Sequence, residues 1–239
     1  MFTKKCSLTS YDLRTIKEAI VDILPLAIAT VPWGVLCGSM AVNVGLTAIQ
    51  AQFMSLLVFA GAAQLAAVAI IGTGGTIITM FSSTFVIGSR HLLYSAVFRE
   101  YVRNSSRCLR FSIAFFLTDE MFAVTCRHME KYKLFSPVYA LASGVTFYLI
   151  WNFSTFLGIV ADQYIPNLEH LGLEFAIAAT FIAIVIPSVK SKATLIAVLC
   201  SGGSAIVLSK FANEYALVAS TLIGMSLGYL SQNKVTDHG

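Results

Sequence analysis

The sequence predicts an all-α fold: a polytopic transmembrane helical bundle of about 7–8 membrane segments, some of them broken or re-entrant. Three observations predict it. Of the 239 residues, 57% are apolar and only 12% are charged, and the mean hydropathy is +0.78. Soluble domains average about 45–50% apolar and about 25% charged residues. One soluble core cannot bury this excess, so we expect lipid to cover it, and the composition excludes disordered and collagen-like classes.

A bilayer core needs about 20 mostly apolar residues per helix, and charged or turn residues divide this chain into eight such segments. An amphipathic cytoplasmic segment, residues 1–19, precedes them, and a tail, residues 231–239, follows. Residues 20–230 are therefore predicted to form a single transmembrane domain. The eight segments are Ile20–Val44, Ala48–Ile71, Thr76–Phe98, Phe111–Cys126, Phe135–Val160, Leu171–Val189, Ala193–Leu208 and Tyr215–Leu230.

Basic residues in short loops predict the orientation, because Lys and Arg stay on the cytoplasmic side. Both termini and the basic loops after the fourth and sixth segments are expected inside, and the loop 161–170, which holds no Lys or Arg, outside. The loop after the third segment disagrees, because its four arginines would lie outside if residues 76–98 and 111–126 both crossed fully. The conflict disappears if both segments enter and leave on the cytoplasmic side, so the sequence leaves their crossing open.

Several function classes receive no support. The formal net charge of +4 is a poor indication of nucleic acid in a membrane protein, so we expect no nucleic-acid partner. The five cysteines are scattered without metal-ligand spacing, and we expect neither a metal nor a cofactor. No phosphate-binding loop, zinc-protease motif or nucleophile elbow occurs, so we do not expect an enzyme.

Two clusters of ionisable residues lie inside apolar segments, Arg90-His91 and Asp119-Glu120. Such residues are costly at membrane depth and usually face a cavity or one another. One interpretation is an Arg90–Asp119 ion pair that merely holds two segments together. The other is a polar site that recognises a charged substrate or relays protons, in which His91 or a carboxylate titrates.

Helix breaks give a second indication of a site. Pro25, Pro32 and Gly34 interrupt the first segment, and Gly61 loosens the second. Broken helices within membranes are tolerated where they line a cavity, and their free backbone groups bind the charged ends of small solutes. For Gly34 and Gly38, close packing between helices is an equally good interpretation.

Gln64 and Trp151 also lie in mid-segment. The amide of Gln64 must find a hydrogen-bond partner, in another helix or in a ligand. Trp151 lies away from the membrane interface, where Trp normally collects, and either walls an apolar pocket or packs. The order of Pro-led and Phe-Ala-rich segments at 25–64 and 137–187 also indicates a weak internal repeat.

Four motifs that follow one another between Pro32 and Ala123 carry a family resemblance, which extends from about Asp22 to Leu230. The sequence resembles the AzlC family, the large subunit of a bacterial branched-chain amino acid exporter. The motifs are Pro32-Trp33-Gly34, Phe59-Ala60-Gly61-Ala62-Ala63-Gln64, Arg90-His91-Leu92-Leu93-Tyr94 and Leu117-Thr118-Asp119-Glu120-Met121-Phe122-Ala123.

The resemblance implies a secondary transporter of the bacterial inner membrane that exports valine, leucine, isoleucine and in some members methionine. It implies a small AzlD-type membrane subunit as partner, and a higher oligomer of that pair is left open. The family positions that carry over as substrate-binding or proton-coupling residues are Gln64, Arg90, His91, Asp119 and Glu120, with Trp151 a looser match.

The residues themselves agree with a zwitterionic apolar substrate. Arg90 and the broken helix ends suit its carboxylate, Asp119 suits its ammonium, and Phe59, Phe147 or Trp151 would receive its side chain. Proton coupling would use Asp119 or Glu120 together with His91. Two alternatives remain: a passive channel or facilitator for small solutes, and an accessory membrane subunit whose polar clusters are structural.

Overall fold

The computed structural model describes residues 10–162, 164, 182, 185–186, 189–210 and 216–233. Every regular element within these residues is a helix, so the predicted all-α class is confirmed. The chain divides into two compact units, Met1–Thr180 and Phe181–Gly239. The predicted sixth segment, Leu171–Val189, lies almost entirely outside the described residues.

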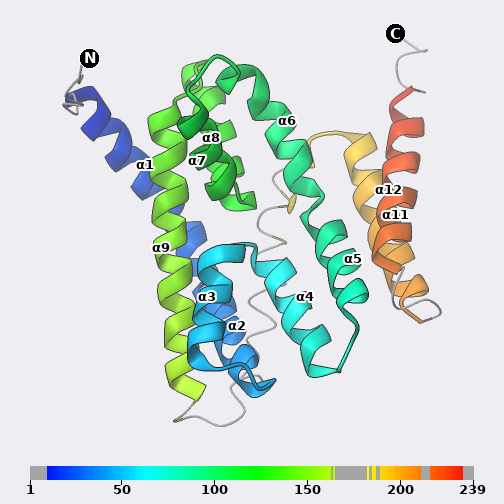
Figure 1. The fold of residues 1–239 in the computed structure, drawn as a ribbon. Helices are drawn as coiled ribbons and strands as arrows, with labels where there is room; N and C mark the ends of the chain where they lie inside the picture. The colour runs from blue at the N-terminus through cyan, green and yellow to red at the C-terminus, as the bar shows by residue number, and fades with distance from the viewer. Residues whose placement is uncertain are drawn as a thin grey trace. The chain divides into compact units, whose positions relative to one another are not determined.

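Nine helices form the described part of the first unit, in an arrangement that the ribbon makes easy to follow (Figure 1). They are α1 (Ser10–Ala29), α2 (Val31–Asn43), α3 (Ala48–Val58), α4 (Gly61–Gly72), α5 (Ile77–Gly88), α6 (Arg90–Val102), α7 (Arg107–Phe116), α8 (Asp119–Tyr132) and α9 (Pro137–Asp162).

One described helix, α9 with 26 residues, is long and apolar enough by itself to cross a membrane. The helices α1 and α2 are together long and apolar enough to form one span, but the chain bends by 51° between them. The other apolar helices that the structure describes are shorter: α3, α4, α5 and α11 (Lys192–Leu208). The predicted segments are therefore helical where described, but most are broken near their middle.

The break between α1 and α2 falls at Thr30 rather than at Pro25. Pro25 lies inside the continuous helix α1, which corrects the prediction that it interrupts this segment. Pro32 lies in the first turn of α2. Because proline has no N–H, it cannot bond to the carbonyl four residues earlier, and the α1 ladder is interrupted there.

Helix α9 is the axis along which the other helices of this unit are ordered. Tyr139 near its start donates a hydrogen bond to Asp22 of α1, and Asp162 at its end accepts one from Ser39 of α2. The pair α1–α2 therefore runs in the same direction as α9. Close contact along this line is possible because Gly158 abuts the backbone of Val35.

Helices α3 and α4 form a hairpin that reaches the middle of α9 and turns back. Tyr148 donates to the carbonyl of Leu56 near the end of α3, and Gln52, one turn earlier, bonds to Asn152. Helix α4 then leads away from the middle, because Gly72 at its end touches Val44, just after α2. The predicted segment Ala48–Ile71 is thus two helices of opposite direction rather than one.

Helices α7 and α8 form a second hairpin, which approaches the middle of α9 from the opposite end. Phe116 at the end of α7 contacts Gly144 of α9. Helix α8 leads back, because His128 stacks on Tyr139 and Tyr132 donates to Glu18. Helices α5 and α6 lie between the two hairpins in sequence and, unlike them, continue in one direction across the Ser89 break (Figure 1).

The two halves α1–α4 and α5–α8 have the same construction in opposite directions. Each has a helix pair broken at one residue, Thr30 or Ser89, and then a four-residue connection, 44–47 or 103–106. A hairpin broken at two residues follows in each half. This inverted repeat differs from the predicted echo at 25–64 and 137–187: α9 is unbroken, and the echo beyond residue 162 lies mostly outside the described residues.

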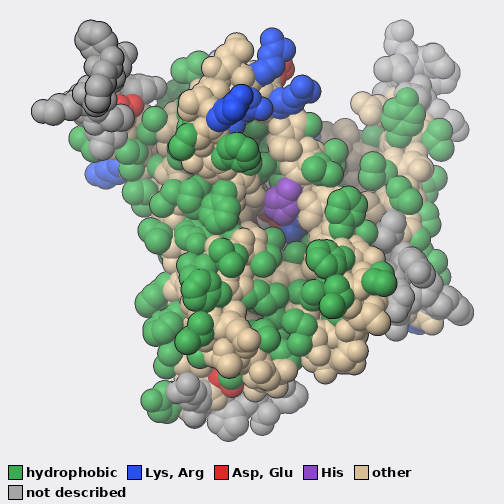
Figure 2. Space-filling view, in the orientation of Figure 1, with side chains coloured by type: hydrophobic (Ala, Val, Ile, Leu, Met, Phe, Trp, Pro, Cys, Tyr) green, Lys and Arg blue, Asp and Glu red, His purple; other side chains and the backbone are tan. Residues whose placement is uncertain are grey.

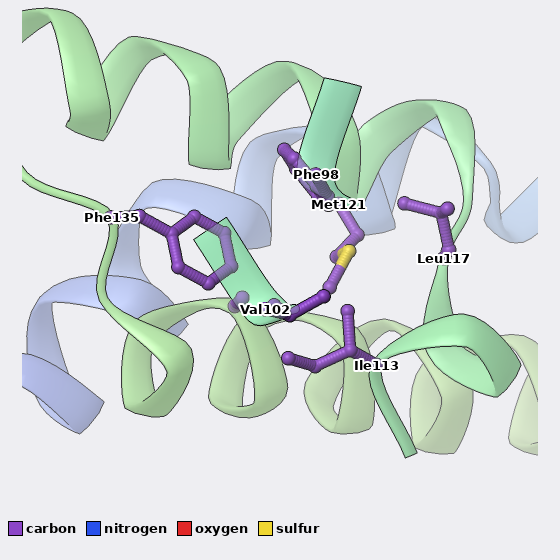
Figure 3. Packing of buried hydrophobic residues seen from close by; sticks show 7 residues of the cluster. Phe98, Val102, Ile113, Leu117, Met121 and Phe135 are labelled. Carbon is purple, nitrogen blue, oxygen red and sulfur yellow. The ribbon is translucent and has the colours of Figure 1, made fainter. Parts of the chain in front are cut away.

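An apolar cluster ties α6, α7 and α8 together at one end of the unit. Phe98 and Val102 of α6 pack against Ile113 of α7, Leu117 and Met121, with Phe135 closing the group (Figure 3). At the other end, Ala41, Ala51, Val68 and Ile159 form a smaller cluster of α2, α3, α4 and α9. These clusters fix the outer ends of the half-helices.

Apart from Arg90, the described Lys and Arg side chains of the first unit gather at one end, near the start of α9 and over the junction of α6 and α7 (Figure 2). The opposite end has none, because residues 18–89 and 134–162 contain neither Lys nor Arg. At the basic end, Tyr132 and Lys131 both donate to Glu18, and these bonds lower the pKa of the Glu18 carboxyl.

The described helices of the second unit, α11 and α12 (Ala216–Asn233), pack against each other along their length. Gly224 lies against Ser201, and Gly228 lies against Ala197. Because the residue numbers change in opposite directions, the two helices are antiparallel. Small residues at both contacts let the backbones approach closely.

Candidate functional site

The four helix breaks of the first unit meet at one small cavity beside the middle of α9. Its volume is about 30 Å³, which is room for about two water molecules and for no amino acid. The lining residues come from the α1–α2, α3–α4, α5–α6 and α7–α8 breaks and from α9: Thr30, Trp33, Phe59, Ala60, Gly61, Ala62, Arg90, His91, Thr118, Asp119, Glu120, Phe147 and Trp151.

An ion pair crosses the cavity between the starts of two half-helices. The Nη1 atom of Arg90, the first residue of α6, lies 2.8 Å from Oδ2 of Asp119, the first residue of α8. The Asp119 side chain is 10% exposed and the Arg90 side chain 29%. The predicted pair therefore forms, and its position in the cavity wall leaves both a structural and a binding role available.

The two charges differ in their relation to the helix dipoles. A carboxylate at a helix N-terminus is stabilised, so Asp119 and Glu120 suit the start of α8. A cation there is disfavoured, yet Arg90 and His91 open α6. His91 donates from Nδ1 to the carbonyl of Gly88, the last residue of α5. Local helix stability does not explain Arg90, but a partner across the cavity does.

Three of the four helices that start at the cavity have no side-chain cap. Ala60 precedes α4 and has no suitable side chain, while Thr30 and Ser89 donate backwards to Ala27 and Val86 instead of capping α2 and α6. Only Thr118 caps its helix, α8, by accepting from the N–H of Met121. A helix start favours anions through its dipole, and at α2, α4 and α6 no side chain of the preceding residue occupies it.

The outer starts of the half-helices are built differently. Thr47, Thr76 and Ser106 each cap α3, α5 or α7 by accepting from a backbone N–H three residues later. The described chain therefore caps its helices away from the cavity and leaves most of them open towards it. This contrast gives an independent indication that the cavity receives a polar ligand.

Phe59 forms the apolar side of the cavity in a strained conformation. Its φ of 40° and ψ of 46° are left-handed values, which non-glycine residues rarely adopt and which cluster at functional sites. The ring lies 4.8 Å from that of Tyr148 and 6.0 Å from that of Phe147, centroid to centroid. Trp151 lies against Gly61, where a Cβ atom would collide with its ring.

Two buried side chains at the cavity, those of Trp151 and Glu120, have polar atoms that are available to a ligand. The indole N–H of Trp151 has no hydrogen-bond partner within the described residues, although the side chain is only 3% exposed. Glu120 is 5% exposed, and no cation of the described chain lies within salt-bridge distance of it. Burying an unpaired carboxylate is costly, so this position favours a bound proton or cation.

Four predicted site residues are not among the residues that line the cavity. Gln64 is fully buried in α4 and donates to Ser55 of α3, whose hydroxyl is 2.9 Å from that of Thr155 in α9. Its amide therefore ties three helices together. Gly34 packs against Ser154, and Pro25 lies within α1. Pro32 occupies the first turn of α2, next to the lining residue Trp33.

Thr30, Ala60 and Ala62 are lining residues that were not singled out as site residues from the sequence. The sequence marks these positions only by what is missing. Ala60 has no side chain that can cap the helix after it, and the hydroxyl of Thr30 does not accept from an N–H further along the chain. No group of three or more His, Cys, Asp or Glu side chains in the described residues could hold a metal ion.

The comparisons with known proteins agree with these motifs. The family profile described as AzlC protein matches residues 25–165, from within α1 to just after α9. This chain belongs to the AzlC family. The match contains every lining residue of the cavity, so the breaks and charges described above lie within the family's own region.

Relatives of this AzlC-family chain are named as membrane proteins. An uncharacterized membrane protein of Archaeoglobus fulgidus is 27% identical over 87% of this chain and 91% of its own length. The inner membrane protein YgaZ of Escherichia coli is 24% identical over 88% of both chains. A Helicobacter pylori relative, also named an uncharacterized membrane protein, is 22% identical over 88% of this chain. No solved structure matches. The chain is therefore a membrane protein.

Proposed function

We propose that this chain is the large subunit of a secondary exporter of branched-chain amino acids, driven by protons and assembled with a small AzlD-type membrane subunit. The observation that carries the proposal is the cavity, where four broken helices bring together opposite charges, uncapped helix starts and an aromatic wall. Transporters commonly bind substrate where discontinuous helices of inverted repeats meet.

The arrangement of the helices supports a polytopic inner-membrane topology with the N-terminus in the cytoplasm. If α1–α2, α5–α6 and α9 cross and the two hairpins re-enter, every described Lys and Arg of the first unit except Arg90, which lines the central cavity, lies on one side. This agrees with the positive-inside rule. In this arrangement residues 76–98 cross, residues 111–126 re-enter, and the unexpected re-entrant segment is α3–α4.

Single cysteines in a cysteine-free background test this topology. Thr73 lies in the loop after α4, and Asn104 lies in the loop after α6. In spheroplasts, we expect an impermeant maleimide to label Thr73→Cys and not Asn104→Cys, which reacts only after the membrane is opened. Equal labelling of both positions in intact spheroplasts would show that α5–α6 does not cross.

The cavity groups match the two ends of an amino acid. Arg90 and the starts of α2, α4 and α6 suit a carboxylate, because a guanidinium group and the N-terminal end of a helix dipole both carry positive charge. Asp119 and Glu120 suit the ammonium group. Phe59, Phe147 and Trp151 offer apolar surface to the substrate side chain. Substrate entry must first enlarge the cavity, because about 30 Å³ holds no amino acid.

Proton coupling follows from the same groups. Substrate ammonium and a proton compete for Asp119 and Glu120, because either one neutralises a buried carboxylate. His91, next to Arg90, is a further candidate for the proton-coupling role at the cavity wall. Competition of this kind links proton entry on one side to amino-acid release on the other.

Leucine transport in proteoliposomes that hold this chain and its candidate small subunit tests the proposal. We expect uphill leucine movement that follows an imposed pH gradient and disappears when an ionophore collapses that gradient. Flux that ignores the gradient would identify a facilitator or another coupling ion. If folded protein moves no leucine, the substrate assignment fails, and other amino acids must be screened.

A further inference from the structure

A second, much larger hollow lies between α6 and α7, and it shares no lining residue with the central cavity. Its volume is about 760 Å³, and it is open to the surface. Its floor is apolar, with Leu92, Ala96, Ile113, Ala114 and Leu117 among its lining residues. We call this hollow the α6–α7 groove.

The mouth of the α6–α7 groove is strongly basic. Four arginines line it: Arg99 and Arg103 near the end of α6, and Arg107 and Arg110 at the start of α7. No acidic side chain of the described chain lies within salt-bridge distance of any of them. The cluster accounts for blue surface at the end of the molecule (Figure 2).

Two of these arginines occupy positions that their own helix disfavours. Arg107 is the first residue of α7 and Arg110 the fourth, where the helix dipole stabilises anions and repels cations. Mutual repulsion among the four charges adds to this cost. An anion bound at the mouth would remove both penalties, and the start of α7 would contribute its own dipole.

The length of the groove matches one leaflet of a bilayer. Leu92 and Arg103 are 11 positions apart, and Arg107 and Leu117 are 10 positions apart. At about 1.5 Å of rise per residue, these separations correspond to roughly 15–17 Å. Half of a hydrocarbon core is about 15 Å. A lipid chain with its headgroup at the arginines would therefore end near the middle of the membrane.

We infer that the α6–α7 groove binds an anionic phospholipid from the leaflet at the arginine-rich end, with the headgroup on Arg99, Arg103, Arg107 and Arg110 and an acyl chain along the apolar floor. Basic pockets between helices on the cytoplasmic side are suited to such headgroups. A crossing partner helix fits less well, because the groove is one leaflet deep and its charge lies only at the mouth.

Native mass spectrometry of the purified protein tests the site with two added lipids of identical acyl chains, phosphatidylglycerol and phosphatidylcholine. We expect preferential binding of phosphatidylglycerol. In Arg103→Gln/Arg107→Gln the phosphatidylglycerol affinity should fall about fivefold for each arginine removed. The matched control Arg14→Gln/Arg127→Gln neutralises two exposed arginines outside the groove and should change the affinity little.

Filling the floor gives a second, independent variant. Ala96 and Ala114 are exposed within the groove, so Ala96→Phe/Ala114→Phe occupies it without disturbing a buried contact. This variant should lose the tightly bound lipid while it keeps its thermal stability in detergent. Equal affinity for the two lipids would overturn the inference. So would floor substitutions that leave lipid binding intact and instead block assembly with the small subunit.

Discussion

Asp119→Asn is expected to abolish gradient-driven leucine transport while the protein still folds. Asn keeps the size and the helix-start position of Asp119 but removes the charge that Arg90 faces at 2.8 Å. Breaking a fully buried pair costs about 3–5 kcal/mol. The cost should be smaller here, because the Arg90 side chain is 29% exposed. Proteoliposome flux and the thermal unfolding midpoint would be measured on the same preparation.

Asp162→Asn is the matched control, because Asp162 lies at the far end of α9 and bonds to Ser39 outside the cavity. It should leave coupling intact. Unchanged gradient-driven flux in Asp119→Asn would remove Asp119 from the mechanism.

A double variant separates a structural role of the ion pair from a binding role. Removing both partners of a buried pair leaves no uncompensated charge, whereas removing one partner does. Arg90→Gln/Asp119→Asn should therefore be more stable than Asp119→Asn. If the pair is only structural, the double variant should also recover transport. We expect stability without transport, because the substrate then finds neither charge.

The sequence predicts the positions of the helical segments well because each is an apolar run with polar ends. Ala48–Ile71 and Ala193–Leu208 agree with α3–α4 and α11 to within a residue. Whether a segment continues across the membrane or turns back cannot be predicted in the same way. A run of 24 apolar residues has the same composition whether it crosses the membrane or turns back. The turn at Phe59 depends on a left-handed backbone conformation, and the residue there is not a glycine, which would have predicted such a conformation.

The inverted repeat was hidden for a related reason. Its halves share the order of breaks and connections, and α2, α3 and α4 agree with α6, α7 and α8 in length to within two residues. Thr47 and Ser106 correspond as helix caps, and Thr30 and Ser89 correspond as breaks. Hydropathy patterns alone therefore paired segments by composition and selected 137–187 instead.

The candidate site was predictable as chemistry but not as geometry. Ionisable residues inside apolar segments can be recognised from the sequence because burying them is costly. Arg90 and Asp119, which were recognised in this way, do form an ion pair. Gln64 carries the same cost, yet its amide nitrogen donates to Ser55 in the packing between helices, while its buried amide oxygen has no partner among the described residues. The energetic cost of burying a polar group identifies the group from the sequence. Only the positions of the neighbouring helices show whether its partner is another protein group or a ligand.

Gly158→Ala is expected to cause the largest loss of stability among single substitutions in α9. A Cβ atom at Gly158 would collide with the backbone carbonyl oxygen of Val35, and one at Gly38 with that of Thr155. Backbone atoms cannot rotate away as a side chain can, so α2 and α9 must separate. Overpacking typically costs about 1–3 kcal/mol and occasionally more. The midpoint of thermal unfolding in detergent should fall clearly.

Gly202→Ala in α11 is the matched control, since nothing lies within 4 Å of its Cβ position. Alanine is favoured over glycine within a helix by about 1 kcal/mol, so this variant should be at least as stable as the natural protein. The comparison also decides what Gly158 does at the contact between α9 and α2. A Gly158→Ala protein that keeps its unfolding midpoint but loses transport would assign this contact to helix movement during transport. A lowered midpoint would assign it to the packing on which the cavity is built.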